Sequence, residues 1–264
     1  MEVKKYTGLP SLRKNCYDLW KALKDGKTDD QYIVYTHVSP EDFLQIQHSV
    51  NSDTLRYIRW VYQFSTGTLK MKVIASPEHE VVSATITSML AIQIVAIHLT
   101  EDIDALGTVH VKYGDFSKRA DASWAPASQT PKLSMVVEVG VSESAPYLTK
   151  DAIAWLDAPG SPVNIAITVK VYRKKPKLVL RTWECRNESN STHVTRGSGE
   201  RRPHAVTDVR IILRNGVIDV SQELKLSFEK VVGRPPNAGE KDFVFTEENF
   251  RTLARKVWRI QKFL

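Results

Sequence analysis

Two acidic residues lie inside segments that otherwise have the apolar, β-branched character of buried strands. Asp121 lies in Lys-Arg-Ala-Asp-Ala-Ser-Trp, and Glu138 lies in Met-Val-Val-Glu-Val-Gly. A carboxylate in a buried strand has to be paired, protonated or bound to a cation. Two such strands in succession can bring both carboxylates to one point, which is the minimum requirement for a divalent metal with oxygen ligands. The alternative is that both acids face water or pair with Lys118 and Arg119.

The remaining composition is that of an ordinary globular protein. The chain has 264 residues, of which 42% are apolar and 25% are charged. Its first residues have no apolar signal core, and its apolar runs are short. These features predict an intracellular protein, in the cytoplasm or nucleus, that does not enter a membrane. Cys16 and Cys185 are far apart in sequence, which argues against a disulfide framework or a zinc site.

Positive charge is concentrated in the C-terminal part of the chain. Of the net charge of +7, residues 170–264 contribute 21 basic and 11 acidic side chains, or +10, and residues 1–169 contribute −3. A basic half can attract a polyanion such as nucleic acid over a long range. A solvated basic surface is the alternative.

Local patterns predict an alternation of helices and strands. Ser39 and the sequence Ser76-Pro77 are typical helix starts. The expected helices are 11–24, 39–48, 77–99 and 145–156, and the expected strands are 55–64, 69–74, 107–113, 119–124, 133–141, 163–172 and 178–183. The central order of helix, three strands, helix and strand indicates a mixed sheet with helices on both faces.

The C-terminal part is expected to form a hairpin and a helix. Asn215-Gly216 favours a tight turn between strands 209–213 and 217–226, and Thr246 is the expected cap of a helix over 247–263. We therefore predict four regions: a helical N-terminal extension (1–54), a core (55–185), a mobile basic loop (186–206) and a C-terminal hairpin plus helix (207–264).

This order of elements resembles the PD-(D/E)XK nuclease superfamily. The resemblance covers roughly residues 55–173. Ser76-Pro-Glu-His-Glu80, Lys118-Arg-Ala-Asp121 and Val136-Val-Glu-Val-Gly140 are similar to the Uma-type endonuclease branch, and the C-terminal segment resembles that of uncharacterised fungal proteins. The implied fold is α/β (α+β) with a restriction-endonuclease-like core, in which an αβββαβ unit forms a mixed central sheet flanked by helices.

The resemblance implies hydrolysis of phosphodiester bonds with Mg²⁺ or Mn²⁺. Asp121, Glu138 and the backbone carbonyl of Val139 would hold the metal, which would polarise the phosphoryl group and activate water. Glu80 is the expected third acid, and Glu78 is the alternative. Either glutamate could instead interact only with the dipole of its helix.

The sequence departs from the family pattern at two positions. Gly140 stands where the family has its lysine, and Ala120 stands where it has proline. Lys150 is the first candidate for a displaced lysine, and Lys170 is the second, although either could be a solvated surface residue. His79 is a candidate proton shuttle or metal neighbour, with a helix-start histidine bonded to backbone as the alternative.

The implied ligand is nucleic acid, DNA rather than RNA. Lys118, Arg119, Trp124 and Lys170 are the expected contacts, with core packing as the alternative role of Trp124. A homodimer is a further expectation, by analogy with enzymes that cut both strands of a duplex. The alternative functions are a catalytically inactive nuclease-fold module that binds nucleic acid or a protein, and a structural interaction protein.

Overall fold

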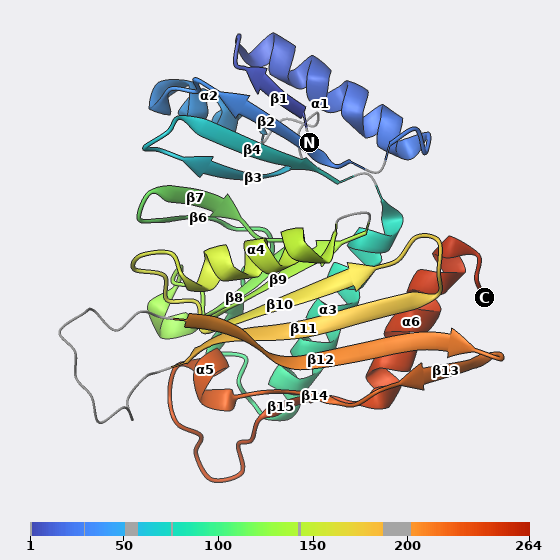
Figure 1. Cartoon of the computed structure of the whole chain (residues 1–264). Helices are drawn as coiled ribbons and strands as arrows, with labels where there is room; N and C mark the ends of the chain where they lie inside the picture. Colours follow the sequence, from blue (N-terminus) through green and yellow to red (C-terminus); the bar gives the residue numbers. More distant parts are fainter. Residues whose placement is uncertain (1, 29, 51–57, 75, 142–143, 187–201) are drawn as a thin grey trace, which may run out of the picture.

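The computed structural model describes the chain except for residues 1, 29, 51–57, 75, 142–143 and 187–201. Within the described residues, the strands form a six-stranded, a seven-stranded and a two-stranded sheet. Helices lie against both large sheets (Figure 1). The predicted mixed α/β class is therefore confirmed.

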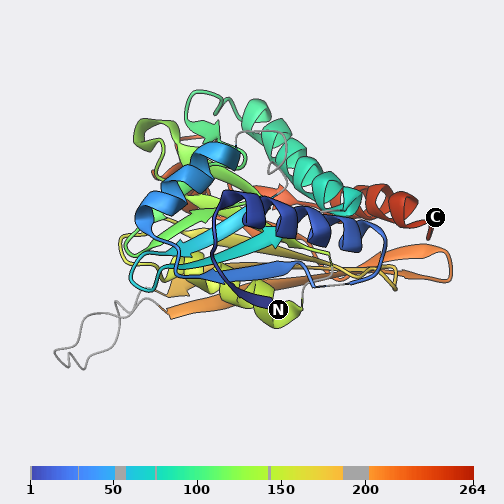
Figure 2. The same cartoon turned by 90° about the horizontal axis from the view of Figure 1, so that it is seen from above.

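The six-stranded sheet is built mainly by the N-terminal part of the chain. Helices α1 (Leu9–Lys24) and α2 (Pro40–Val50) cover its outer face (Figures 1 and 2). In the order β1-β2-β4-β3-β7-β6, its strands are β1 (Glu2–Lys5), β2 (Tyr32–Thr36), β4 (Thr68–Val73), β3 (Ile58–Gln63), β7 (Phe116–Arg119) and β6 (His110–Tyr113). Strands β1 and β2 run parallel, and the remaining neighbours are antiparallel.

Strand β4 shows why this sheet forms. Leu69, Met71 and Val73 alternate along the strand and are buried with α1 and α2. Because side chains alternate between the faces of a strand, Lys70 and Lys72 point the other way. The basic face is not in water: the side chain of Lys72 is only 6% exposed.

The seven-stranded sheet contains Glu138, and Asp121 directly precedes one of its strands. In the order β13-β12-β11-β10-β9-β8-β5, its strands are β13 (Val217–Val220), β12 (Arg202–Arg214), β11 (Lys177–Arg186), β10 (Ile165–Val171), β9 (Met135–Gly140), β8 (Ala122–Pro126) and β5 (Ile103–Ala105). Strands β9 and β10 are parallel, and α4 (Ala145–Leu156) connects them on one face. Helices α3 (Pro77–Ala96) and α6 (Glu247–Gln261) cover the other face (Figure 1).

The seven-stranded sheet contains the order α3, β5, β8, β9, α4, β10, with β6 and β7 of the other sheet inserted between β5 and β8, and this order is consistent with the αβββαβ unit that the resemblance implies. Neighbouring strands in this unit pair antiparallel, antiparallel and then parallel. The prediction of a sheet covered on both faces is confirmed, because separate buried clusters lie on its two sides. The assignment to a restriction-endonuclease-like core stays a prediction.

The chain crosses from one large sheet to the other at Ala120 and Asp121. Strand β7 ends at Arg119 in the six-stranded sheet, and β8 begins at Ala122 in the seven-stranded sheet. The single strand predicted over 119–124 is therefore wrong. The predicted strand over 107–113 is shortened to β6, which pairs with β7 and not with β8. Alternation of residue types cannot reveal such a crossing, because the chain is extended on both sides of it.

Helix α3 begins where the sequence predicts. Ser76 accepts a hydrogen bond from the backbone N–H of His79, and Pro77 occupies the first turn. By length and composition α3 could cross a membrane, but core helices of soluble proteins pass the same test. Helix α3 is buried on one side only, because Ile92 and Val95 are 68% and 61% exposed.

The turn at Asn215-Gly216 and the C-terminal helix are confirmed, but the strand predicted over 217–226 ends at Val220. Asn215 and Gly216 both have positive φ, at 49° and 77°, as a type I′ turn requires. Strands β14 (Leu224–Leu226) and β15 (Phe243–Phe245) pair as a small sheet, with α5 (Phe228–Val232) between them in sequence. A short 3₁₀ helix, Ala127–Gln129, follows β8.

The four predicted regions are only partly covered by the described residues. The boundary between residues 54 and 55 lies outside them, and so does most of the predicted basic loop. Residues 202–206 of that loop belong to β12. The segment 1–54 contributes β1 and β2 as well as the expected helices, and its core is shared with β3 and β4.

Candidate functional site

Asp121 lies where the two large sheets meet. Its backbone N–H donates to the carbonyl of Val137, which continues the pairing of β8 with β9. Its side-chain Oδ2 then accepts a hydrogen bond of 2.8 Å from the backbone N–H of Val139. The carboxylate therefore accepts a backbone hydrogen bond from β9 at a point just before the first residue of β8.

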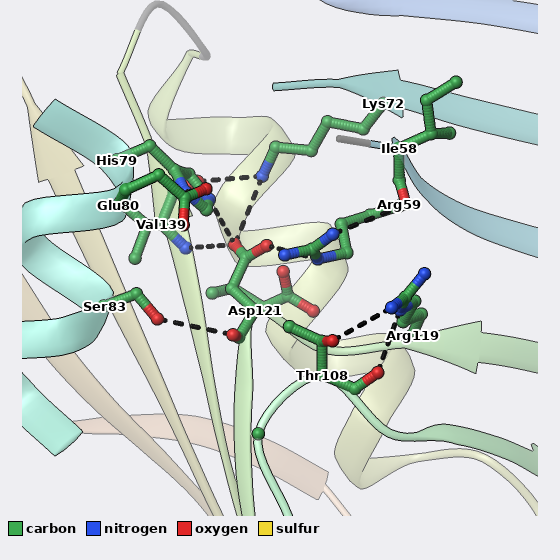
Figure 3. A network of polar contacts seen from close by, with 12 residues as sticks. Ile58, Arg59, Lys72, His79, Glu80, Ser83, Thr108, Arg119, Asp121 and Val139 are labelled. Carbon is green, nitrogen blue, oxygen red and sulfur yellow. Dashed lines mark hydrogen bonds and ion pairs between the residues drawn. The ribbon is translucent and has the colours of Figure 1, made fainter. Parts of the chain in front are cut away.

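Three basic side chains surround the Asp121 carboxylate (Figure 3). Arg59 Nε lies 3.2 Å from Oδ1, His79 Nε2 lies 3.0 Å from Oδ2, and Lys72 Nζ lies 3.8 Å from Oδ2. These residues come from β3, α3 and β4. All four side chains are at most 9% exposed. Asp121 is thus the shared counter-ion of three elements.

This environment changes the pKa of Asp121 and of His79. Burial by itself would raise the pKa of Asp121, but the charges of His79, Lys72 and Arg59 outweigh burial and hold that pKa well below its usual value. Burial by itself would lower the pKa of His79, but attraction by Asp121, together with a weaker contribution from Glu80, raises it. The ion pair between Asp121 and His79 is therefore favoured at neutral pH.

Glu138 is buried on the face of β9 that α4 covers. Trp155 Nε1 of α4 donates a hydrogen bond of 2.6 Å to Glu138 Oε1. Burial, followed by the negative charge of Asp121, raises the pKa of Glu138 to about 8. The two acids are therefore close enough to influence one another, but they have different states at pH 7: Asp121 is ionised and Glu138 is mostly protonated.

The residues present do not fit a divalent cation. The oxygens of Asp121 are already in contact with basic groups, and Lys72 Nζ donates to the carbonyl of Val139 at 2.8 Å. In the part of the chain that the structure describes, no group of three His, Cys, Asp or Glu side chains is placed to hold a metal ion. A hard cation needs several free oxygen ligands, and here Lys72 engages two of the oxygens that the resemblance assigned to the metal.

Lys72, like Arg59, is a residue of this site that the sequence did not reveal. It alternates with apolar residues along β4, which is the usual pattern of a strand with one solvated face. Only the packing of the six-stranded sheet against β9 buries that face. Arg59 lies directly opposite Lys72 on β3, so the same tertiary contact buries both.

A small pocket opens beside this network, and we call it the cationic pocket. It encloses about 20 Å³, enough for a water molecule or a single ligand oxygen. Five basic residues from β3, β4 and β7 line it, together with aromatic and acidic side chains. The full lining is Tyr32, Arg59, Trp60, Val61, Lys70, Lys72, Lys118, Arg119, Glu138 and Asp151.

Two predicted contact residues, Lys118 and Arg119, line the cationic pocket. Lys118 is buried, and its Nζ donates to the carbonyl of Asp151 at 3.2 Å and lies 4.4 Å from the centre of the Trp155 ring. Burial lowers the pKa of Lys118. Arg119 Nε donates to the carbonyl of Thr108 at 2.8 Å (Figure 3).

The other predicted site residues lie away from this pocket. Glu80 is 59% exposed and contacts His79 Nδ1 at 3.3 Å, not Asp121. Lys150 is exposed on α4, and Lys170 Nζ donates to the carbonyl of Val141 at 3.4 Å. Trp124 is 1% exposed within the core, so its ring is not available to stack on a base.

The comparisons with known proteins include a weak similarity to a solved structure. No family model matches the chain, and no curated protein matches it. One similar solved structure is described as a "putative nuclease belonging to DUF820" from Anabaena variabilis. It has 12% sequence identity and a TM-score of 0.40, and the match covers 59% of this chain and 83% of that chain. This similarity is too low to assign a function, and the Uma-type and fungal relationships stay predictions.

Proposed function

We propose that this protein binds the phosphate backbone of a nucleic acid at the cationic pocket. The observation that carries the proposal is the convergence of five basic side chains from three strands on one pocket. The proposed ligand is DNA, with RNA as the alternative, and the proposed setting is intracellular. A further proposal is that two copies of the chain bind one nucleic acid as a homodimer. The shortest oligonucleotide that binds with full affinity would test it.

The charge balance of the pocket favours an anionic ligand. Five cations stand against the three carboxylates of Asp121, Glu138 and Asp151. Two positive charges therefore remain even when Glu138 is counted as ionised. Such a local excess attracts phosphate groups, and the attraction weakens as salt is added.

Aromatic rings hold two of these cations in place. Lys70 Nζ lies 4.2 Å from the centre of the Tyr32 ring, and Lys118 lies over Trp155. Cation–π contacts of this kind restrict the lysine side chains before a ligand arrives, which lowers the entropy lost on binding. The side chain of Lys70 is 24% exposed and can be reached from solvent, whereas Lys72 and Lys118 are buried.

Binding of labelled DNA and RNA oligonucleotides, followed by fluorescence anisotropy over a series of salt concentrations, tests the proposal. We expect Lys70→Ala and Arg119→Ala each to weaken binding and to reduce the slope of log K against log salt by about one. Lys225→Ala is the matched control, because Lys225 is the exposed residue of β14. Equal affinity of all these variants and the wild type would rule out the cationic pocket as the binding site.

A second candidate is the divalent-metal-dependent nuclease that the resemblance implies. The observation in its favour is that two buried carboxylates, Asp121 and Glu138, lie close enough for one to raise the pKa of the other. In this alternative, Lys72 or Lys118, rather than Lys150, would take the role of the family's lysine. The family's lysine position itself is occupied by Gly140.

Incubation of DNA and RNA with Mg²⁺ or Mn²⁺ separates the two candidates. The binding proposal expects no cleavage above that of a Glu138→Gln preparation. Cleavage by the wild type that both Glu138→Gln and chelation abolish would establish the nuclease. Lys150→Ala serves as a control, because Lys150 lies outside the pocket and its loss should change neither result.

A further inference from the structure

Lys72 lies between the two groups that would otherwise be the best oxygen ligands of the site. Its Nζ is 2.8 Å from the carbonyl oxygen of Val139 and 3.8 Å from Asp121 Oδ2. Both acceptors belong to the junction between β8 and β9, whereas Lys72 comes from β4 of the other sheet. The ammonium therefore reaches across the boundary between the sheets to satisfy them (Figure 3).

The position of this ammonium excludes a metal ion by space and by charge. A Mg²⁺ or Mn²⁺ ion bound to the same oxygens would lie about 2.0–2.2 Å from them. It would overlap the ammonium, which is already in contact with the carbonyl. Arg59 and His79 add positive charge on the same carboxylate, so the three basic groups together repel a divalent cation at short range, and loss of Lys72 lowers that repulsion.

We propose that Lys72 is a built-in replacement for a divalent cation. The ammonium is fixed to β4 and neutralises Asp121 in every folded molecule, so the site has its cation without taking one from solution. Removal of the ammonium, with Asp121 and the Val139 carbonyl kept, should open a site that a divalent cation can enter. This inference does not depend on the nucleic-acid ligand.

The test is the binding of Mn²⁺ to purified protein, measured by electron paramagnetic resonance of the free ion. We expect Lys72→Ala to bind one Mn²⁺ at least about tenfold more tightly than the wild type. Lys70→Ala is the matched control, because Lys70 lies on the same face of β4 and pairs with Asp151 rather than Asp121. It should bind Mn²⁺ no better than the wild type. The double variant Lys72→Ala/Asp121→Asn should lose the gained site.

A folded Lys72→Ala protein that gains no Mn²⁺ binding would overturn the proposal. If that variant does not fold, the wild type decides by nuclear magnetic resonance, because bound Mn²⁺ broadens nearby amide signals. Unchanged signals of His79 and Val139, while exposed acids such as Glu247 are broadened, would support the proposal. Selective broadening of His79 and Val139 in the wild type would overturn it, whatever the outcome for nucleic acid.

Discussion

Two carboxylic acids on neighbouring strands have opposite protonation states because their surroundings differ. Asp121 faces three basic side chains, so its charge is favoured. Glu138 is buried and lies near the negative charge of Asp121, so its neutral form is favoured although Lys72 and Lys118 act in the opposite direction. Burial raises the pKa of both acids, and only at Asp121 do the basic neighbours outweigh it.

Glu138 should make the stability of the protein fall as pH rises. Its folded pKa of about 8 lies above the ordinary value of 4.5. The folded state therefore holds the proton more tightly, and the stabilisation is present at low pH and lost between these two values. We expect Glu138→Gln, which stays neutral, to lack this decline. Between pH 6 and 8, the free energy of unfolding of the wild type should fall relative to the variant by up to about 1.4 kcal/mol per pH unit.

Urea unfolding of both proteins at several pH values measures this difference. Asp121 and His79 are present in both, so their own titrations largely cancel in the comparison. Parallel profiles for the two proteins would show that Glu138 is ionised in the folded state and that its carboxylate has a positive partner.

At the scale of single elements, the residues at helix ends and turns are the ones whose local interactions fix where an element begins and ends. The capping box of α6 is an example: Thr246 Oγ1 accepts from the N–H of Asn249 at 3.3 Å, and Asn249 Oδ1 accepts from the N–H of Thr246 at 2.9 Å. These bonds satisfy backbone groups that the helix cannot satisfy itself. Helix α6 covers the seven-stranded sheet, so its stability contributes to that of the core.

Loss of this cap should be measurable. We expect Thr246→Ala to lower the free energy of unfolding by about 1 kcal/mol, because the N–H of Asn249 loses its acceptor. Thr246→Ser keeps the hydroxyl and should retain most of the stability. Urea titration compares the three proteins, and equal loss in both variants would indicate that the methyl group of Thr246 matters more than its hydroxyl.

The sequence predicted those elements whose signals are local. Ser76, Thr246 and Asn215-Gly216 each act through backbone groups within a few residues, and each prediction is confirmed. The importance of Asp121 and Glu138 as buried acids was also visible, because charges are rare within apolar strands. Their partners were not visible, since Lys72 and Arg59 read as a solvated strand face until the second sheet covers them. Trp124 was considered as a ligand contact, but its ring is buried in the hydrophobic cluster formed with α3 and α6.

At the scale of the whole molecule, Asp121 links the two large sheets through charge. Its partners Arg59 and Lys72 belong to one sheet, and its backbone pairs with β9 of the other. The large hydrophobic clusters of the two sheets are separate, but a smaller cluster joins Val111 of β6 to residues of α4, β9 and β10. The buried ion network is therefore the polar part of the contact between the sheets, beside this smaller apolar cluster.

Removal of the Asp121 charge should destabilise the whole protein. We expect Asp121→Asn to lower the free energy of unfolding by about 3–5 kcal/mol, because Arg59 and Lys72 would be left buried without their counter-ion. Asp208→Asn is the control: its pair with Arg181 is about one-third exposed and should cost about 1 kcal/mol or less. Both are measured by urea unfolding followed by fluorescence and circular dichroism.

A loss in Asp121→Asn no greater than in Asp208→Asn would mean that other contacts hold the sheets together. It would also remove the basis for treating Lys72 and Arg59 as partners of one acid.

The path of the chain through the two sheets has a consequence for dissection of the protein. The polypeptide builds β1–β4, leaves to form α3 and β5, returns for β6 and β7, and leaves again at Ala120. No single cut can separate the sheets, because any N-terminal fragment that ends before β6 lacks two strands of its own layer. The complementary fragment would present β7 with a bare edge where β3 belongs. Neither piece is a self-sufficient folding unit, so studies of either layer have to use the intact chain.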